Sequence, residues 1–202
     1  MDSACGRNAR EKPGMPERDG ERRKCGVIRP AAMDDLPELL ALYAKARDFM
    51  AAHGNPTQWG NSSPAVWVLE EDMRRKRLFI CEREGKVCGV FAFPIGADPT
   101  YEKVEGGGWL SDAPYGTIHR LAGEETERGI FEECLSWCRK QIGHIRIDTH
   151  ENNGIMRHLI EKNGFVRCGI IHVADGSPRI AYEWIRPERE NGPAGPEQEK
   201  DR

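Results

Sequence analysis

The clearest periodicity in the chain runs from Thr117 to Phe165. Thr117–Ala122 is a short β-prone run, and the polar turn Gly123–Arg128 follows it. Apolar residues then recur at helical spacing over Ile130–Gln141, so the turn leads into a helix. A helix N-terminus presents unpaired N–H groups and the positive end of its dipole, and both favour an anion. The pattern therefore predicts a strand, an anion-binding turn and a helix.

The second half of this stretch predicts another strand and another helix. His144–Asp148 alternates between an isoleucine face and a face that carries Arg146 and Asp148. The polar turn Thr149–Asn153 leads into an amphipathic helix, and Asn163-Gly164 ends that helix as a C-cap pair.

The rest of the chain supplies a strand, two helices and a hairpin before this stretch and a closing hairpin after it. The residues are Val27–Arg29, Leu36–Met50, Ser63–Arg77, Leu78–Cys81 with Val87–Phe93, and Phe165–Val173 with Ile180–Ile185. Ile95–Gly116 is irregular and rich in aromatic residues, and it is either a pocket wall or a segment that covers the core. The order of elements indicates an α/β protein with a mixed sheet and helices on both faces.

Composition adjusts this picture at the two ends. The 202 residues suit one domain. Residues 1–24 and 188–202 are rich in Pro, Gly and charge, so we expect a disordered arm and tail around a folded domain at 25–187. A net charge of −3 argues against nucleic acid as a partner. Without an apolar run of membrane-spanning length or a signal peptide, we expect no membrane contact and a cytoplasmic location.

The seven cysteines predict free thiols rather than disulfides. Their number is odd, they form no CxxC pair, and several occupy apolar positions of helices or strands. Cys134 and Cys138 are one helical turn apart with no second ligand pair nearby, so we predict no metal site.

Three patterns resemble the GNAT superfamily of acyl-CoA-dependent N-acetyltransferases, and the resemblance spans roughly Val27 to Trp184. The start, VIRPAAMDDLPELLALYAKA, is similar to the first strand and helix of the family. The block IHRLAGEETERGIFEECLSWC lies where the family has its acetyl-CoA strand, turn and helix. The block HENNGIMRHLIEKNGF resembles its Asn-containing helix, which ends in Gly-Phe.

The resemblance implies a GNAT-like fold in which the strands at Thr117–Ala122 and His144–Asp148 splay apart around acetyl-CoA. The expected cofactor contacts are Leu121 and Ala122 on the strand, the turn residues Glu127, Arg128, Gly129, Ile130 and Phe131 at the pyrophosphate, and Asn153 at the second helix.

The chain departs from the family pattern at two places. Only Arg128-Gly129 remains of the glycine-rich turn, and three glutamates precede or flank it. Ile160 stands where many members keep a tyrosine that protonates the departing thiolate. A non-catalytic GNAT-like module, with impaired CoA binding and a ligand or protein partner, is therefore the alternative to an enzyme.

Three side chains are candidates for proton transfer in an enzyme of this kind. His119 is the best base by position, and its alternative role is to pair with a carboxylate on the sheet. His150 is a second base or proton donor unless its turn only caps a helix, and Tyr182 is either a replacement acid or an ordinary sheet aromatic.

The function expected from the resemblance is direct transfer of an acetyl group from acetyl-CoA to the amine of a small molecule or amino-acid-like substrate. Asp148 is expected to anchor a cationic substrate, and the aromatic residues expected to line its pocket are Trp59, Tyr101, Trp109 and Tyr115. The chain is expected to act as a monomer or a homodimer.

Overall fold

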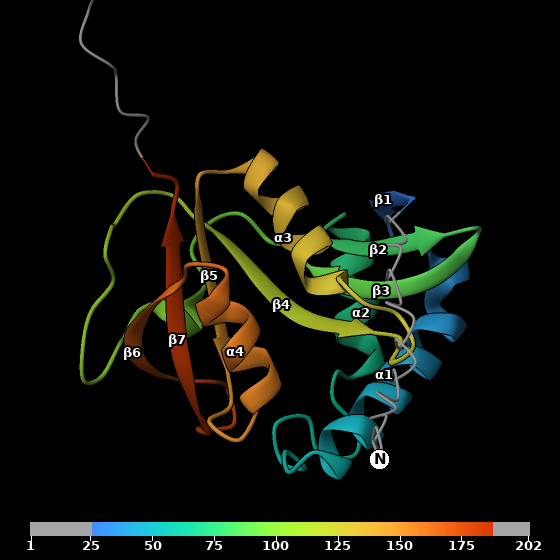
Figure 1. Ribbon diagram of the computed structural model, residues 1–202, viewed down its shortest axis with the longest axis horizontal. Helices are drawn as coiled ribbons and strands as arrows, with labels where there is room; N and C mark the ends of the chain where they lie inside the picture. Colours follow the sequence, from blue (N-terminus) through green and yellow to red (C-terminus); the bar gives the residue numbers. More distant parts are fainter. Residues whose placement is uncertain (1–25, 188–202) are drawn as a thin grey trace, which may run out of the picture.

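One mixed sheet organises the computed structural model, which describes residues 26–187. The predicted arm over residues 1–24 and tail over residues 188–202 lie outside this range. The strands follow the spatial order β1-β2-β3-β4-β5-β7-β6, and only β4 and β5 pair in parallel (Figure 1). Their bounds are β1 Val27–Pro30, β2 Leu78–Arg83, β3 Lys86–Ala92, β4 Gly116–Gly123, β5 His144–Thr149, β6 Val166–His172 and β7 Pro178–Ile185. The predicted mixed sheet and both hairpins are confirmed.

Helices cover both faces of the sheet, as predicted. They are α1 Leu36–Ala52, α2 Val66–Arg74, α3 Ile130–Gln141 and α4 Gly154–Lys162. In Figure 1, α3 and α4 lie in front of the sheet, with α1 and α2 behind it. The predicted start of α2 at Ser63 is wrong, because Ala65 has extended backbone (φ −68°, ψ 147°) and is the N-cap.

The two faces of β4, β5 and β7 differ in polarity. On the face covered by α3 and α4, Ile118, Ile147 and Ile180 belong to one apolar core. On the other face Thr117 pairs with Arg146, and Arg146 pairs with Glu183. The alternation that predicted two faces for His144–Asp148 is therefore confirmed, with ionic groups on one of them.

The segment between β3 and β4 covers this polar face in place of a helix. It contains the 3-10 turn Pro99–Tyr101 and is tied to β6 by a bridge between Glu105 and Ile170. At Gly107 a Cβ atom would lie 2.0 Å from the carbonyl oxygen of Cys168, so only glycine allows this close approach. The segment is thus fixed on the sheet along its length.

Strands β4 and β5 pair at only three positions, from Gly116 to Ile118, and then separate. Beyond that point the register of β4 against β3 shifts between Val90 and Ala92, where Arg120 has φ +53°. A bulge with a residue in the left-handed region bends a strand locally. The bulge in β4 accompanies the opening between the two parallel strands that was expected from the resemblance.

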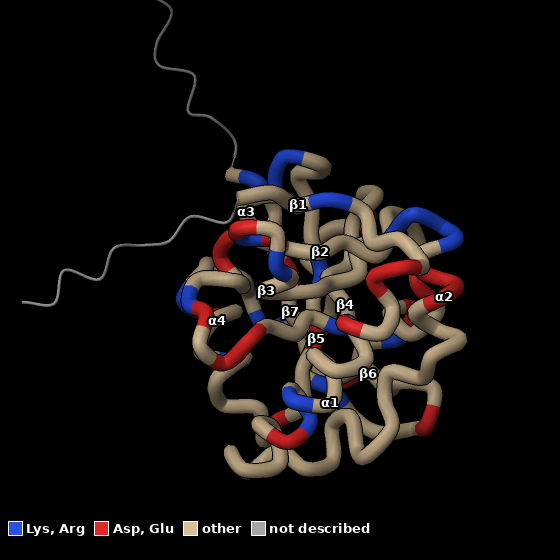
Figure 2. The backbone as a smooth tube through the Cα atoms, turned by 90° about the vertical axis from the view of Figure 1, so that its right-hand side faces the viewer, with Lys and Arg blue, Asp and Glu red and all other residues tan. Residues whose placement is uncertain are grey.

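Charged residues are distributed over the surface in short alternating groups. Figure 2 shows the acidic end of α2 followed directly by basic residues, the run Arg74–Arg77. Among the described residues, no helix is long and apolar enough to span a bilayer, and no group of three or more metal-ligating side chains occurs. Five described cysteines are buried and form no disulfide: Cys81, Cys88, Cys134, Cys138 and Cys168.

Candidate active site

A cleft of about 920 Å³ opens where β4 and β5 separate. His119 and Leu121 on β4, and Asp148 on β5, line it. Other wall residues come from the α1–α2 segment, the β3–β4 segment, the start of α4 and the β6–β7 turn; they include Gln58, Trp59, Asp98, Asn153, Met156, Asp175 and Arg179. The cleft therefore brings together groups that are widely separated in the sequence.

His119 is held in the cleft wall by a carboxylate from the β3–β4 segment. Its Nε2 lies 2.9 Å from Asp98 Oδ2, and the imidazole is 18% exposed. Burial acts to raise the pKa of Asp98, but hydrogen bonds from His119 and Thr100 lower it overall, so this carboxyl stays ionised. Because an ionised carboxylate only accepts hydrogen bonds, Nε2 is the donor in this contact, and a neutral imidazole in this tautomer has its lone pair on Nδ1.

Asp148 faces the other ring nitrogen of His119. The distance from His119 Nδ1 to Asp148 Oδ1 is 3.8 Å, and the Tyr101 hydroxyl donates to the same oxygen at 2.6 Å. Burial, and then the charge of Asp148, raises the pKa of Tyr101, which remains a neutral donor. Two carboxylates thus flank one imidazole, and both stabilise a positive charge on it.

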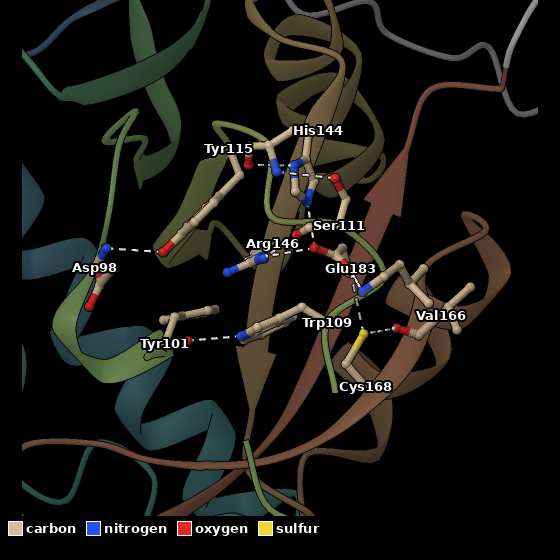
Figure 3. A network of polar contacts seen from close by, with 12 residues as sticks. Asp98, Tyr101, Trp109, Ser111, Tyr115, His144, Arg146, Val166, Cys168 and Glu183 are labelled. Atoms are coloured by element: carbon tan, nitrogen blue, oxygen red, sulfur yellow. Dashed lines mark hydrogen bonds and ion pairs between the residues drawn. The ribbon is translucent and has the colours of Figure 1, made fainter. Parts of the chain in front are cut away.

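Three of the aromatic residues predicted to line the substrate pocket, Tyr101, Trp109 and Tyr115, form a network on the polar face of the sheet (Figure 3). The Tyr115 hydroxyl accepts the Asp98 N–H at 3.0 Å, and Trp109 Nε1 donates to the Tyr101 carbonyl at 2.8 Å. None of the three lines the cleft among the described residues. Their prediction as substrate-binding residues is wrong because their rings pack on the sheet and on one another. Trp59 does line the cleft.

The guanidinium of Arg146 joins the aromatic residues into one network. Its Cζ lies 3.9 Å from the ring centroids of both Trp109 and Tyr115. Its Nε donates to Glu183 Oε1 at 2.9 Å, and His144 Nε2 hydrogen-bonds the same oxygen. Figure 3 shows this cluster beneath the β3–β4 segment. The network fixes the segment that carries Asp98.

The other two predicted catalytic residues do not reach the cleft. His150 Nδ1 accepts the backbone N–H of Asn152 at 3.2 Å, so the imidazole closes the turn before α4. The Tyr182 hydroxyl donates to Glu161 on α4 at 2.9 Å, and its ring belongs to the apolar core. Neither side chain lines the cleft in the described range, and both predicted roles are corrected to structural ones.

The turn before α3 retains donors for an anion. The backbone N–H groups of residues 128–132 have no hydrogen-bond acceptor within residues 26–187. Gly129 is the N-cap of α3 and has φ +81°. Glu127 differs, because its N–H donates to the Glu124 carbonyl and its carboxylate pairs with Arg83. The structure argues against Glu127 as a pyrophosphate contact; Arg128, Gly129, Ile130 and Phe131 remain predicted ones.

Two features that seemed to oppose a pyrophosphate in this turn are offset. Lys45 pairs with Glu124 at 2.8 Å and Arg83 pairs with Glu127, which balances two of the three glutamates before Arg128. The side chains of Ile130 and Phe131 are buried in the apolar core, so their bulk does not stand on the solvent side of the turn. The residues present fit an acyl-CoA pyrophosphate.

Asn153 caps α4 beside the cleft, and its surroundings include a residue that sequence reasoning missed. Asn153 Oδ1 accepts the Met156 N–H at 3.1 Å, while its Nδ2 donates to Gln58 Oε1 at 3.0 Å. Asn55 also donates to that oxygen, at 2.8 Å. Gln58 therefore joins the α1–α2 segment to α4. Because Gln58 and Asn153 are 95 positions apart, no local sequence pattern could predict this contact.

Ala122 pairs with Val90 in the sheet, so its cofactor contact stays a prediction.

Solved structures of acetyltransferases share this fold. A GNAT-family acetyltransferase from Streptococcus agalactiae is 27% identical, with 80% of this chain and 96% of the other covered and a TM-score of 0.73. This chain has the fold of the GNAT superfamily. A putative acetyltransferase from Staphylococcus aureus is 22% identical over 79% of this chain and 99% of its own, with a TM-score of 0.58.

The GNAT fold also extends to a more distant structure, the NatC complex bound to Gag peptide and CoA. It is 16% identical, covers 80% of this chain and 98% of the other, and has a TM-score of 0.51. No family model and no curated protein matches the sequence. The GNAT neighbours support acetyl transfer as the general activity.

Proposed function

We propose that this protein of GNAT fold transfers an acetyl group from acetyl-CoA to the amine of a small molecule or amino-acid-like substrate. The observation that carries the proposal is His119, an imidazole with a free Nδ1 in the wall of the cleft and an ionised carboxylate on Nε2. A base held in this way suits removal of a proton from an attacking amine. The activity is assigned to the domain at 25–187.

In the proposed reaction, the amine nitrogen attacks the thioester carbonyl carbon, and His119 Nδ1 takes a proton from that nitrogen. The carbon–sulfur bond then breaks, and the thiolate leaves with its electron pair. Ile160 is fully buried and its side chain has no ionisable proton, so it cannot protonate the thiolate. The imidazolium of His119, flanked by Asp98 and Asp148, is the acid proposed to return the proton.

Acetyl-CoA is proposed to enter between β4 and β5. The supporting features are the three-residue pairing of these strands, Leu121 and Asn153 on the cleft, and the N–H groups at the start of α3. One solved structure of similar fold was determined with CoA. None of these supporting features involves a metal ion.

Calorimetric titration of acetyl-CoA into the full chain tests this assignment. We expect saturable heat and a rise in the unfolding temperature, because a bound ligand stabilises the folded state. Arg128→Glu adds negative charge beside the proposed pyrophosphate and should weaken binding, whereas Lys103→Glu on the exposed surface of the β3–β4 segment should not. No heat and no thermal shift at millimolar acetyl-CoA would reject the proposed function.

A non-catalytic binding module is the second candidate, and Ile160 at the tyrosine position is the observation that favours it. The two are separated by incubation with radiolabelled acetyl-CoA and a pool of amines. Any enzyme-dependent labelled product excludes the binding-only function. Acetyl-CoA binding without product, across the whole pool, would support it.

A further inference from the structure

Arg179 is a buried cation in the wall of the cleft. It lies at the start of β7, is 6% exposed and lines the cleft. Its Nη1 donates to Ser177 Oγ and to the Pro178 carbonyl, both at 2.9 Å, and its Nη2 donates to the Gln58 carbonyl at 3.2 Å. All three acceptors are neutral oxygens, so they orient the guanidinium without balancing its charge.

The other two buried arginines in the described chain have carboxylate partners. Arg83 pairs with Glu127 and Glu133, and Arg146 pairs with Glu183. No carboxylate oxygen of residues 26–187 lies within 4 Å of the Arg179 guanidinium. Since buried charges in proteins are normally paired, an ionic partner is missing here.

The nearest acidic residue in the turn is already engaged. Asp175 accepts hydrogen bonds from the backbone N–H and the hydroxyl of Ser177, and it contributes only a longer-range field at Arg179. A guanidinium has five N–H donors, of which three are used. Nε–H and one hydrogen of Nη2 have no acceptor among the described residues, which suits two-point binding of a planar anion.

Arg179 lies on the same face of the sheet as His119 and Asp148. In the register of β5 and β7, Asp148 pairs with Ala181, and Arg179 is two residues before Ala181. Side chains two residues apart on a strand share a face, and diagonal neighbours across an antiparallel pair are roughly 7–8 Å apart. The cleft therefore presents a cation roughly 7–8 Å along the sheet from Asp148, one of the two carboxylates around the proposed base.

We propose that Arg179 binds the carboxylate of the acceptor substrate, so that the acceptor is an amino acid whose amine faces His119 and Asp148. The inference rests on the proposed function and names its substrate class. The amino acid binds with its ammonium group toward Asp148 and its carboxylate toward Arg179, which matches the separation of charges in the cleft. The ammonium group loses one proton to solvent before the neutral amine attacks, and His119 takes the second. Gln58 fixes the guanidinium through its carbonyl and so positions this contact.

The test compares matched acceptors with the full-length protein. Free L-amino acids and their carboxamides are incubated with radiolabelled acetyl-CoA, and kcat/KM is measured for each pair. We expect the acids to be preferred about tenfold to hundredfold, the effect of losing a charge-assisted hydrogen bond. Arg179→Gln should abolish that preference, because the rate for the acids should fall toward the rate for the carboxamides. Arg75→Gln, at a cleft-lining arginine already paired with Glu71, should retain it.

Two further measurements keep the proposal falsifiable. Arg179→Lys keeps the charge but loses the two-point geometry, so an intermediate preference is expected even if Arg179→Gln is poorly folded. Equal rates for acids and carboxamides with the wild-type protein would overturn the proposal. A fall in acetyl-CoA affinity in Arg179→Gln with the acid preference intact would overturn it as well, because Arg179 would then bind a phosphate of the cofactor.

Binding measurements separate failure of this inference from failure of the proposed function. Calorimetry with an amino acid and its carboxamide reports recognition of the carboxylate whether or not turnover occurs. Selective binding of the acid, lost in Arg179→Gln, without any acetyl transfer would support the anion site and reject the enzyme. Acetyl transfer to carboxamides with no selective binding of the acid would reject the anion site alone.

Discussion

The two faces of β4, β5 and β7 are built from the same strands but are held together in different ways. The face under α3 and α4 is an apolar core, with Ile118, Ile145 and Ile147 packed against the helices. The face under the β3–β4 segment carries Arg146, Glu183 and their polar neighbours. Alternation along each strand places both environments within one layer of backbone.

The apolar face therefore stabilises the fold, whereas the polar face carries the residues of the proposed reaction. The apolar face gains stability from burial, which is non-directional and tolerates exchange of similar side chains. On the polar face the groups around His119 depend on specific partners: Tyr115 holds the backbone of Asp98, and Tyr101 holds Asp148. Substitutions on the polar face should therefore change both stability and activity, and those on the apolar face should change stability only.

The largest expected effect is on turnover, at His119. His119→Ala removes the proposed base, so kcat should fall by about 10²–10⁴-fold while acetyl-CoA affinity changes little. Steady-state rates and calorimetry measure the two quantities. His150→Ala is the matched control, since that imidazole only closes the turn before α4. Turnover like wild type in His119→Ala would remove His119 from the mechanism.

The next effect is on stability, at the ionic cluster. Glu183 is fully buried and accepts hydrogen bonds from His144, Arg146 and the Leu110 backbone. Glu183→Gln leaves Arg146 buried without a counter-charge, and the free energy of unfolding in urea should fall by about 3–5 kcal/mol. The exposed control Glu151→Gln should change it by less than about 0.5 kcal/mol.

A double substitution shows whether the charge or the shape of this cluster matters. Replacing both partners, Arg146→Met with Glu183→Leu, removes the uncompensated charge and should recover part of the lost stability. It also removes the cation between Trp109 and Tyr115, so kcat should be lower than in the wild-type protein. Full recovery of both stability and kcat would mean that the polar face has no positioning role.

The contrast between the faces also explains what the sequence could predict. On the apolar side, hydrophobic residues recur at helical spacing in the sequence. That spacing predicted α3 at its observed bounds, Ile130–Gln141. Local chemistry also identified His119 and Asp148 as candidates, and both line the cleft. The Ile95–Gly116 segment has no regular spacing of apolar residues. Its aromatic residues Trp109 and Tyr115 both pack on Arg146 of β5, a contact that no local pattern predicts.

The residues that sequence reasoning missed share one cause. Asp98 is hydrogen-bonded to a histidine 21 positions away, and Arg179 to a carbonyl 121 positions away. An Asp-Pro turn signals only a loop, and an arginine beside a turn signals only a polar strand end. The connecting segments that carry Asp98 and Gln58 fold over the adjacent strands β4, β5 and β7, and that arrangement is a property of the whole fold rather than of any local pattern.

A smaller, pH-dependent effect is expected at Asp98. Its native pKa lies below the ordinary value near 3.9, so on acidification the unfolded chain takes up the proton first. Its stabilising contribution is therefore complete above about pH 4 and is lost as the pH falls through the native pKa. Asp98→Asn should lower stability by roughly 1.5 kcal/mol at pH 7, the low end for a charged hydrogen bond because the side chain is 22% exposed.

The measurement for Asp98 is urea unfolding of both proteins from pH 7 to pH 2.5. The difference between wild type and Asp98→Asn should shrink as the pH falls below about 4. Asp175→Asn is a useful comparison, because that carboxyl also has a lowered pKa but lies in the exposed β6–β7 turn. A difference for Asp98→Asn that stays constant across the range would show that its charge contributes nothing.

The smallest expected effect is on the apolar face. Ile145 is fully buried on β5, next in sequence to Arg146 but pointing to the opposite side. Ile145→Val removes one methylene, which should lower the free energy of unfolding by about 0.5–1.5 kcal/mol and leave kcat and KM unchanged. Urea unfolding and steady-state rates on the same preparation check both halves. A marked loss of kcat would show that packing under α3 also positions His119 and Asp148, so the two faces would not act independently.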